Sequence, residues 1–299
     1  MGHIVWTQWD DLDAPPGVTL LGPSSAPIGG DAFQEVTFYV PRYMAGPEGL
    51  HPIRQMPALQ YVQLPNAGYD DAVDFRRAGL VFCNARGVHD ISTAELALGL
   101  AIASLRELDR FILARSSGAW LSGGQSSLAT KRVALVGYGS IGQTIGGLLE
   151  PFGAEVEAFT RSGQGDTHTM AEFEDLLPTF DVVILILPAT PETVNLMDKR
   201  RLGLMKDGAL LVNVARGTIV DTDALVDELE SGRIRAALDV TNPEPLPGDH
   251  PLWRAPGVII SPHVGGNSTA FEPAMRALLA QQFSRLVSGE SLLNIVMRD

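Results

Sequence analysis

Three residues in the second half of the chain are of types that could carry out acid–base chemistry on an anionic substrate: Arg216, Glu244 and His263. A guanidinium can hold a carboxylate, an imidazole can donate a proton, and a carboxylate can orient and charge that imidazole. Taken singly, each residue also has an ordinary explanation as an exposed charge or a turn residue. Each follows an apolar segment that is typical of a buried strand, at residues 210–214, 238–240 and 258–261. Because ligands bind at the carboxyl edge of an open α/β sheet, we expect the three side chains to share one site.

A glycine-rich turn is the second chemical feature, with the sequence GYGSIG at residues 137–142. It follows a short apolar segment, 133–136, and precedes a segment whose apolar residues recur at helical spacing. A second apolar strand is expected at 156–159. A glycine pattern in this strand–turn–helix–strand setting predicts a dinucleotide-binding site rather than an ordinary tight turn.

Each glycine of this turn has a separate physical use. Gly137 permits the tight turn, Gly139 lets the backbone approach a pyrophosphate, and Gly142 lets the helix and strand pack closely. The phosphates would lie at the helix N-terminus, where unpaired N–H groups favour negative charge. Ser140 and Ile141 lie at that terminus and are therefore included among the expected cofactor-binding residues.

The composition narrows the function classes. At 299 residues, the chain is long enough for two domains. A net charge of −13, with no cluster among its 22 basic residues, disfavours a nucleic-acid partner. The most apolar segments are too short to cross a bilayer, and no signal peptide is expected. The single cysteine, Cys83, cannot form an internal disulfide, which favours a reducing cytoplasm. Six histidines without an H-E-x-x-H or C-x-x-C motif give a zinc site little support.

The order of elements predicts an α/β protein with doubly wound parallel sheets. A capping box at Ser92–Glu95 is expected to open a long helix that ends near Gly118. This helix is apolar on more than one side, which favours contact with a second domain or a second subunit, and we expect a homodimer. The last helix, residues 271–287, should carry the chain back to the first domain. The other expected strands are 4–6, 18–21, 35–40, 59–64, 80–83, 182–187, 209–214, 236–240 and 258–261, with helices at 196–205 and 223–229.

Several motifs together resemble those of the D-2-hydroxyacid dehydrogenases. The motifs occur in the same order as in the family. The resemblance covers most of the chain, because it begins upstream of the glycine turn. They are NAGYD (66–70), TAELALGL (93–100), GYGSIG (137–142), NVARGTIVD (213–221), ALDVTNPEPLP (237–247), HPLW (250–253) and SPHVGG (261–266).

The resemblance implies roles for individual residues. Arg216 would hold the substrate carboxylate and polarise the keto oxygen, His263 would be the acid/base, and Glu244 would pair with the imidazole. Asp239 matches the acidic residue near the nicotinamide carboxamide. The backbone N–H groups of Ala67 and Gly68 match a carboxylate-binding loop of the first domain.

The resemblance also implies two α/β domains. A Rossmann dinucleotide-binding domain, 99–271, would be inserted in a flavodoxin-like substrate domain made of 1–98 and 272–299. The implied reaction is hydride transfer from NAD(P)H to a small 2-keto acid, giving the D-2-hydroxy acid. A cofactor-sensing regulatory protein that keeps this fold without turnover is the alternative from another functional class.

Two positions depart from the family pattern. Arg161 and Ser162 stand where NAD-binding members carry an acidic residue, and a cation with a hydroxyl suits a 2′-phosphate, so we favour NADP over NAD. Arg86 stands where the family more often has proline. It is either a surface charge or, if it faces the cleft, a residue that binds a second anionic group of the substrate. Because the chain lacks the regulatory domain of long phosphoglycerate dehydrogenases, a glyoxylate/hydroxypyruvate-type reductase is the first expectation. A short D-3-phosphoglycerate dehydrogenase is the second.

Overall fold

A computed structural model describes residues 2–298 and divides the chain into two compact units. The first consists of Met1–His89 and Thr269–Asp299, and the second is Asp90–Ser268. The expected boundaries, at 98/99 and 271/272, are therefore displaced. The first shift has a clear cause, because helix α1 (Asp90–Leu105) packs against helix α3 (Ser140–Leu149) and strands β10 (Leu210–Asn213) and β11 (Arg235–Leu238) of the second unit and is therefore part of that unit from its first residue.

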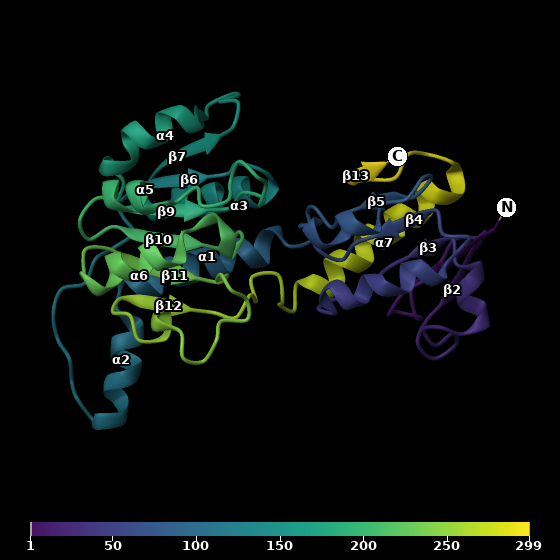
Figure 1. Cartoon of the computed structure of the whole chain (residues 1–299), viewed down its shortest axis with the longest axis horizontal. Coiled ribbons are helices and arrows are strands. Elements are labelled where there is room, and N and C mark those ends of the chain that lie inside the picture. Colours follow the sequence, from purple (N-terminus) through teal and green to yellow (C-terminus); the bar gives the residue numbers. More distant parts are fainter. Residues whose placement is uncertain (1, 299) are drawn as a thin grey trace. The chain divides into compact units, whose positions relative to one another are not determined.

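The second unit is built on a seven-stranded, wholly parallel sheet in the order β8-β7-β6-β9-β10-β11-β12 (Figure 1). This is the Rossmann order, with the topological switch between β6 and β9. The strands are β6 (Arg132–Val136), β7 (Glu155–Thr160), β8 (His168–Thr169), β9 (Val182–Leu185), β10 (Leu210–Asn213), β11 (Arg235–Leu238) and β12 (Val258–Ile260).

Helices cover both faces of this sheet because successive strand residues point to opposite sides. In β6, Val133 and Leu135 pack in one core with residues of α1 and α3. Ala134 and Val136 pack in the other core, with residues of α4, α5 and α6. The helices on that side are α4 (Met170–Leu176), α5 (Lys199–Leu204) and α6 (Thr222–Glu230).

The first unit has a six-stranded sheet in the order β2-β1-β3-β4-β5-β13. Five strands are parallel in the flavodoxin-like order 2-1-3-4-5. The sixth, β13, runs antiparallel to β5, so this sheet is mixed rather than purely parallel as expected. Helix α7 (Phe271–Ser288) packs on one face, and short 3₁₀ helices at 31–35, 46–55 and 70–75 pack on the other. The strands are β1 (His3–Trp6), β2 (Val18–Leu21), β3 (Phe38–Tyr39), β4 (Tyr61–Gln63), β5 (Val81–Cys83) and β13 (Ile295–Arg298).

The helix expected from the capping box differs from the observed one. α1 begins at Asp90, and Ser92 and Thr93 are buried within its first turn, so the predicted cap was wrong. The chain breaks at Glu107, whose φ of 51° lies in the left-handed region, and a separate helix, α2 (Leu108–Ala114), follows. A capping box is instead found at Thr169, which accepts a hydrogen bond from the N–H of Glu172.

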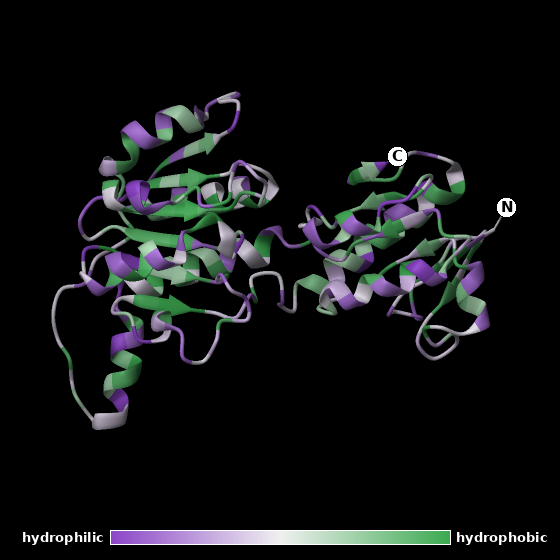
Figure 2. Cartoon of the chain, viewed as in Figure 1, coloured by the Kyte–Doolittle hydropathy of each residue, from purple (hydrophilic) through white to green (hydrophobic). Residues whose placement is uncertain are grey.

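Several predicted elements are shorter in the structure. The strand expected at 35–40 is reduced to β3 because residues 31–35 form a 3₁₀ helix. The helix expected at 196–205 begins only at Lys199, where the side chain of Asp198 caps it. Hydropathy follows the sheets, with hydrophobic residues concentrated along the strands and hydrophilic residues over much of the outer helices (Figure 2). Within residues 2–298, no helix is both long and apolar enough to cross a bilayer.

Candidate active site

Arg216, Glu244 and His263 lie on the loops that follow β10, β11 and β12, three neighbouring strands of the second unit. The Nδ1–H of His263 donates a hydrogen bond to Oε1 of Glu244 at 2.5 Å. The backbone N–H of His263 donates to the carbonyl oxygen of Asp239 at 2.7 Å. His263 has a φ of 53°, a conformation that residues other than glycine seldom adopt and that is often found at functional sites.

The charges of this pair reinforce each other. The hydrogen bond to Glu244 raises the pKa of His263 above its usual value, although partial burial and the charge of Arg216 oppose the shift. The same hydrogen bond lowers the pKa of Glu244. Both shifts favour an imidazolium beside a carboxylate, an arrangement that leaves the Nε2–H of His263 able to act as a proton donor.

The loop that carries Arg216 is fixed by Asn213, a buried residue at the end of β10. Its side-chain amide donates to the carbonyl oxygen of Arg216 at 3.0 Å, and its Oδ1 accepts from the N–H of Ala215 at 3.1 Å. Nη1 of Arg216 also donates to the carbonyl oxygen of Ala215 at 2.8 Å. Asn213 was not among the site residues expected from the sequence, although a polar residue at the end of an apolar strand is a signal that could have identified it.

Gly217 brings this loop against the loop that carries Glu244. A Cβ on Gly217 would lie only 1.9 Å from the carbonyl oxygen of Thr241, so only glycine fits there. Hydrogen bonds hold the second loop as well, because the hydroxyl of Thr222 donates to the carbonyl oxygen of Asn242 at 2.9 Å. Gly217 was not among the site residues expected from the sequence, because its contact joins two loops that follow different strands of the sheet.

Asp239 is buried, and it anchors the segment that contains His263. Its Oδ1 accepts from the hydroxyl of Ser261 at 2.6 Å and from the N–H of Val264 at 2.9 Å. Its Oδ2 accepts from the N–H of Gly265 at 2.8 Å. The carboxylate therefore has a structural task that the sequence did not indicate, and its expected place near a nicotinamide carboxamide stays a prediction.

The glycine turn has the geometry expected for two of its glycines. Gly137 has a φ of 104°, and a Cβ there would lie 2.2 Å from the carbonyl oxygen of Ile186. A Cβ on Gly142 would lie 2.4 Å from the carbonyl oxygen of Gly137, so helix α3 starts very close to β6. Ser140, the first residue of α3, donates its hydroxyl to the carboxylate of Asp90.

The position of Gly139 is different because a Cβ there would meet no atom within 4 Å. The backbone at the N-terminus of α3 is thus open on this side, as the approach of a pyrophosphate requires. Ile141 follows Ser140 in the first turn of α3.

Arg161 and Ser162 are exposed directly after β7, the second strand of the nucleotide-binding order. The loop that begins with them is held by Thr160, whose Oγ1 accepts from the N–H of Gly163 at 3.0 Å. Glu192, from the loop after β9, has a pKa lowered first by a hydrogen bond to Thr190 and also by the charge of Arg161. This acidic neighbour of Arg161 was not expected from the sequence, because it comes from a loop 31 residues further along the chain.

Ala67 and Gly68 belong to the first unit, on the loop after β4. The side-chain amide of Asn84 donates to the carbonyl oxygen of Ala67 at 2.6 Å. Oδ1 of Asn84 accepts from the N–H of Arg86 at 3.2 Å, so one asparagine connects the loops after β4 and β5. Arg86 itself is exposed.

The comparisons with known proteins identify the family. Residues 98–265 match the family model described as "D-isomer specific 2-hydroxyacid dehydrogenase, NAD binding domain". The glyoxylate reductase of Pyrococcus horikoshii is 34% identical over 263 residues, which are 81% of this chain and 78% of the relative. The chain belongs to the D-2-hydroxyacid dehydrogenase family. It is accordingly an NAD(P)-dependent oxidoreductase, and its second unit is the NAD-binding domain of the family.

Two further relatives of this dehydrogenase are informative. The D-3-phosphoglycerate dehydrogenase of Mycobacterium leprae is also 34% identical, over 81% of this chain but only 48% of its own length. A D-isomer specific 2-hydroxyacid dehydrogenase from Xanthobacter autotrophicus Py2, solved in complex with NADPH and MES, has the same fold. Its TM-score is 0.79 at 27% identity, and the match covers 99% of this chain and 98% of the solved one.

The family's dinucleotide fits the residues of this dehydrogenase. The N-terminus of the ten-residue helix α3 is open beside Gly139, and the turn before it is held by two glycines that no other residue could replace. Within the described residues, no group of three or more His, Cys, Asp or Glu side chains could hold a metal ion.

Proposed function

We propose that this dehydrogenase reduces a small 2-keto acid to the D-2-hydroxy acid, with Arg216, Glu244 and His263 as its catalytic residues. The observation that carries the proposal is the 2.5 Å hydrogen bond between Nδ1 of His263 and Glu244. It leaves Nε2 of the imidazolium to donate a proton, in a site that also contains a guanidinium for an anionic substrate.

Each residue has a defined part in the proposed reaction. The reduced nicotinamide, when bound, supplies a hydride for the keto carbon. Arg216 binds the carboxylate and stabilises the negative charge that develops on the keto oxygen. His263 transfers its Nε2 proton to that oxygen and becomes neutral, while Glu244 keeps the ring oriented through Nδ1. Ala67 and Gly68 of the first unit are proposed to donate backbone N–H groups to the substrate carboxylate.

Steady-state kinetics with a panel of keto acids tests the proposal. We expect oxidation of NADPH with glyoxylate and hydroxypyruvate, and a loss of about 10²-fold or more in kcat for His263→Gln, because the proton donor is removed. Binding of NADPH by His263→Gln, measured by fluorescence, controls for folding. Cofactor binding without turnover on any 2-keto acid would favour the cofactor-sensing alternative.

We further propose NADPH as the preferred cofactor, with NAD as the alternative. The support is an exposed cation and hydroxyl, Arg161 and Ser162, at the end of β7, where a 2′-phosphate would need a donor rather than an acidic residue. The Xanthobacter relative was solved with NADPH, which agrees with this choice. Asp239 and residues 137–142 complete the proposed cofactor site.

Glyoxylate and hydroxypyruvate are our first choice of substrates, which would make this dehydrogenase a glyoxylate/hydroxypyruvate-type reductase. The Pyrococcus relative supports them, but the Mycobacterium relative is equally identical and supports a short D-3-phosphoglycerate dehydrogenase as the second candidate. The ratio of kcat/KM for hydroxypyruvate to that for 3-phosphohydroxypyruvate separates the two, because only the second substrate carries a phosphate.

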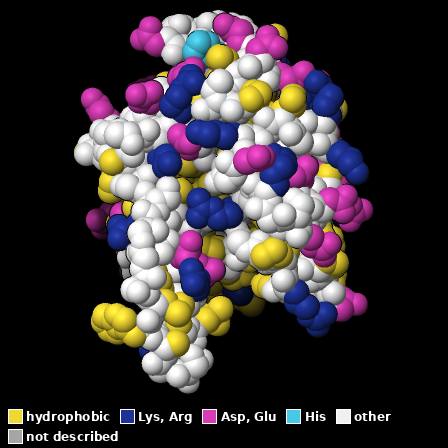
Figure 3. Space-filling model, turned by 90° about the vertical axis from the view of Figure 1, so that its left-hand side faces the viewer, with side chains coloured by type: hydrophobic (Ala, Val, Ile, Leu, Met, Phe, Trp, Pro, Cys, Tyr) yellow, Lys and Arg dark blue, Asp and Glu magenta, His cyan; other side chains and the backbone are white. Residues whose placement is uncertain are grey.

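A homodimer is proposed from the surface of α2. Its residues Leu108, Ile112 and Leu113 are 41%, 65% and 73% exposed, and Trp120 beyond it is 95% exposed. Figure 3 shows hydrophobic side chains gathered at the lower end of the molecule, where α2 lies in Figure 1. Such a patch is typical of a subunit interface. Light scattering should give a dimer for the wild type and a monomer for Leu113→Asp, with Val194→Asp, at a 50% exposed position, as the control.

A reducing, cytoplasmic setting is also proposed, on the basis of Cys83. The residue is buried, and burial raises the pKa of its thiol to about 12. The thiol therefore stays protonated and serves as a small apolar side chain.

A further inference from the structure

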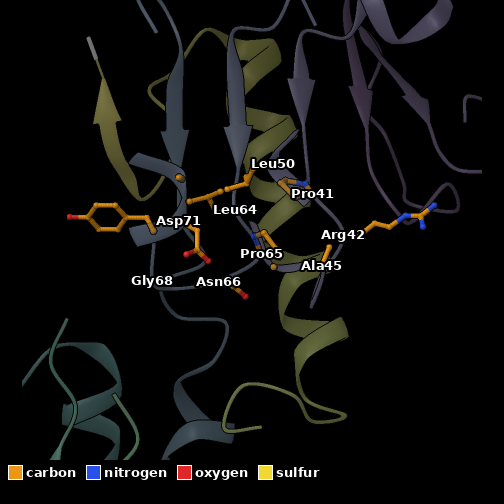
Figure 4. A pocket seen from close by; sticks show the side chains of 12 residues that line it. Pro41, Arg42, Ala45, Leu50, Leu64, Pro65, Asn66, Gly68 and Asp71 are labelled. Atoms are coloured by element: carbon orange, nitrogen blue, oxygen red, sulfur yellow. The ribbon is translucent and has the colours of Figure 1, made fainter. Parts of the chain in front are cut away.

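A small pocket lies in the first unit, beside the loop that contains Ala67 and Gly68. Gly68 and Asn66 line it on the loop side, and Leu50 and Leu64 form an apolar wall (Figure 4). The pocket follows the carboxyl end of β4, the edge where open α/β sheets bind ligands. A keto acid whose carboxylate is bound by this loop would therefore have its remaining substituent near the pocket.

Two charged residues, Asp71 and Arg42, line this pocket, and they differ in where their charged groups lie. Asp71 lines it, and Figure 4 shows its carboxylate next to Gly68. Among the described residues, nothing forms a hydrogen bond or an ion pair with this carboxylate, so it is available to a ligand. Arg42 also lines the pocket, but its guanidinium points away in Figure 4 and lies 6.0 Å from the centroid of the Trp6 ring.

We propose that Asp71 determines the substrate preference of this dehydrogenase by selecting the group attached to the keto carbon. The inference rests on the proposed function. A carboxylate accepts a strong hydrogen bond from a hydroxyl, so a hydroxymethyl group is favoured. A second carboxylate or a phosphate on the substrate is disfavoured, because it would place like charges side by side. Arg86, which could have favoured a second anion, does not line this pocket.

The test compares kcat/KM for four keto acids with NADPH saturating. Values for hydroxypyruvate, oxaloacetate and 3-phosphohydroxypyruvate are each divided by the value for glyoxylate, which has no side group to enter the pocket. In Asp71→Asn, we expect the ratios of oxaloacetate and 3-phosphohydroxypyruvate, the two substrates with a second anionic group, to rise roughly tenfold, because charge repulsion is removed while a hydrogen-bond acceptor remains. Asp71→Glu keeps the charge and should keep low ratios.

A matched control is available on the same short helix. Asp74 is an exposed carboxylate of the 70–75 segment that does not line the pocket, so Asp74→Asn should leave all ratios unchanged. Unchanged ratios in Asp71→Asn, with glyoxylate still reduced, would overturn the inference and leave the proposed function standing. Equal rises in Asp71→Asn and Asp74→Asn would also overturn it, because a general change in surface charge would explain both. Absence of turnover of every keto acid by the wild type would contradict the proposed function itself.

Discussion

The contact between Gly217 and Thr241 gives the sharpest prediction about the candidate active site. In Gly217→Ala, the new methyl carbon would lie 1.9 Å from the Thr241 carbonyl oxygen, whereas real contacts of this kind are at least 3.0 Å. The two loops must therefore separate by about 1.1 Å. Arg216 is adjacent on one loop, and Glu244 lies three residues beyond Thr241 on the other. Since a displacement of about 1 Å can lower a rate by roughly 10²-fold, we expect a loss of about that size in kcat/KM.

The assay follows NADPH absorbance with glyoxylate or hydroxypyruvate as substrate. Overpacking should also lower the free energy of unfolding by about 1–3 kcal/mol, which a urea titration measures. Gly147→Ala is the control, because a Cβ at this exposed position of α3 meets no atom within 4 Å. It should leave kcat/KM unchanged and raise the helix stability by up to about 1 kcal/mol. Wild-type kcat/KM in a folded Gly217→Ala protein would show that the loop contact does not position the catalytic residues.

Three other predictions concern the acid, the cofactor and the core. Because Glu244 raises the pKa of His263, kcat/KM for reduction should fall as pH rises through that pKa. In Glu244→Gln, this fall should begin at lower pH. A fall at the same pH as in the wild type would contradict the pairing. Arg161→Ala should raise the KM for NADPH roughly tenfold or more with little effect on NADH, and equal effects on both cofactors would remove the argument for a 2′-phosphate site. The side-chain amide of Gln282 donates a hydrogen bond to Oε1 of the buried Gln63 at 2.6 Å. Gln282→Leu should therefore lower the free energy of unfolding by about 1–3 kcal/mol, because that oxygen loses its donor. An unchanged urea midpoint would show that this hydrogen bond is dispensable.

The sequence by itself determined the elements that position the candidate site. Apolar strands were readable because residues buried on both faces of a parallel sheet form continuous runs, as in β9 and β10. The glycine turn was readable because its spacing has a local cause: Gly137 must adopt a positive φ and Gly142 must lie against it. The positions of Arg216, Glu244 and His263 after successive strands then placed them at one edge.

The sequence was less informative about where helices begin and end. The predicted cap at Ser92 was wrong because Ser92 and Thr93 are buried inside the first turn of α1, and packing outweighed the local capping signal. The break at Glu107 divides a continuous apolar pattern into α1 and α2, and no glycine or proline marks it. The antiparallel strand β13 was missed because strand pairing depends on a partner, β5, more than 200 residues away.

Only the tertiary structure decided which side chains support the candidate site. The carboxylate of Asp239 accepts three hydrogen bonds from residues 261–265. Gly217 packs so closely against the carbonyl oxygen of Thr241 that a Cβ would not fit. It is likewise the fold of the first unit that places the carboxylate of Asp71 at the pocket beside Gly68, while the guanidinium of Arg42 points away from it. Sequence patterns report which residues are buried and which turns are tight, since these depend on near neighbours. Contacts between distant segments, such as that of Gly217 with Thr241, tolerate shifts of only a few tenths of an ångström. They are therefore set only when the whole chain has packed.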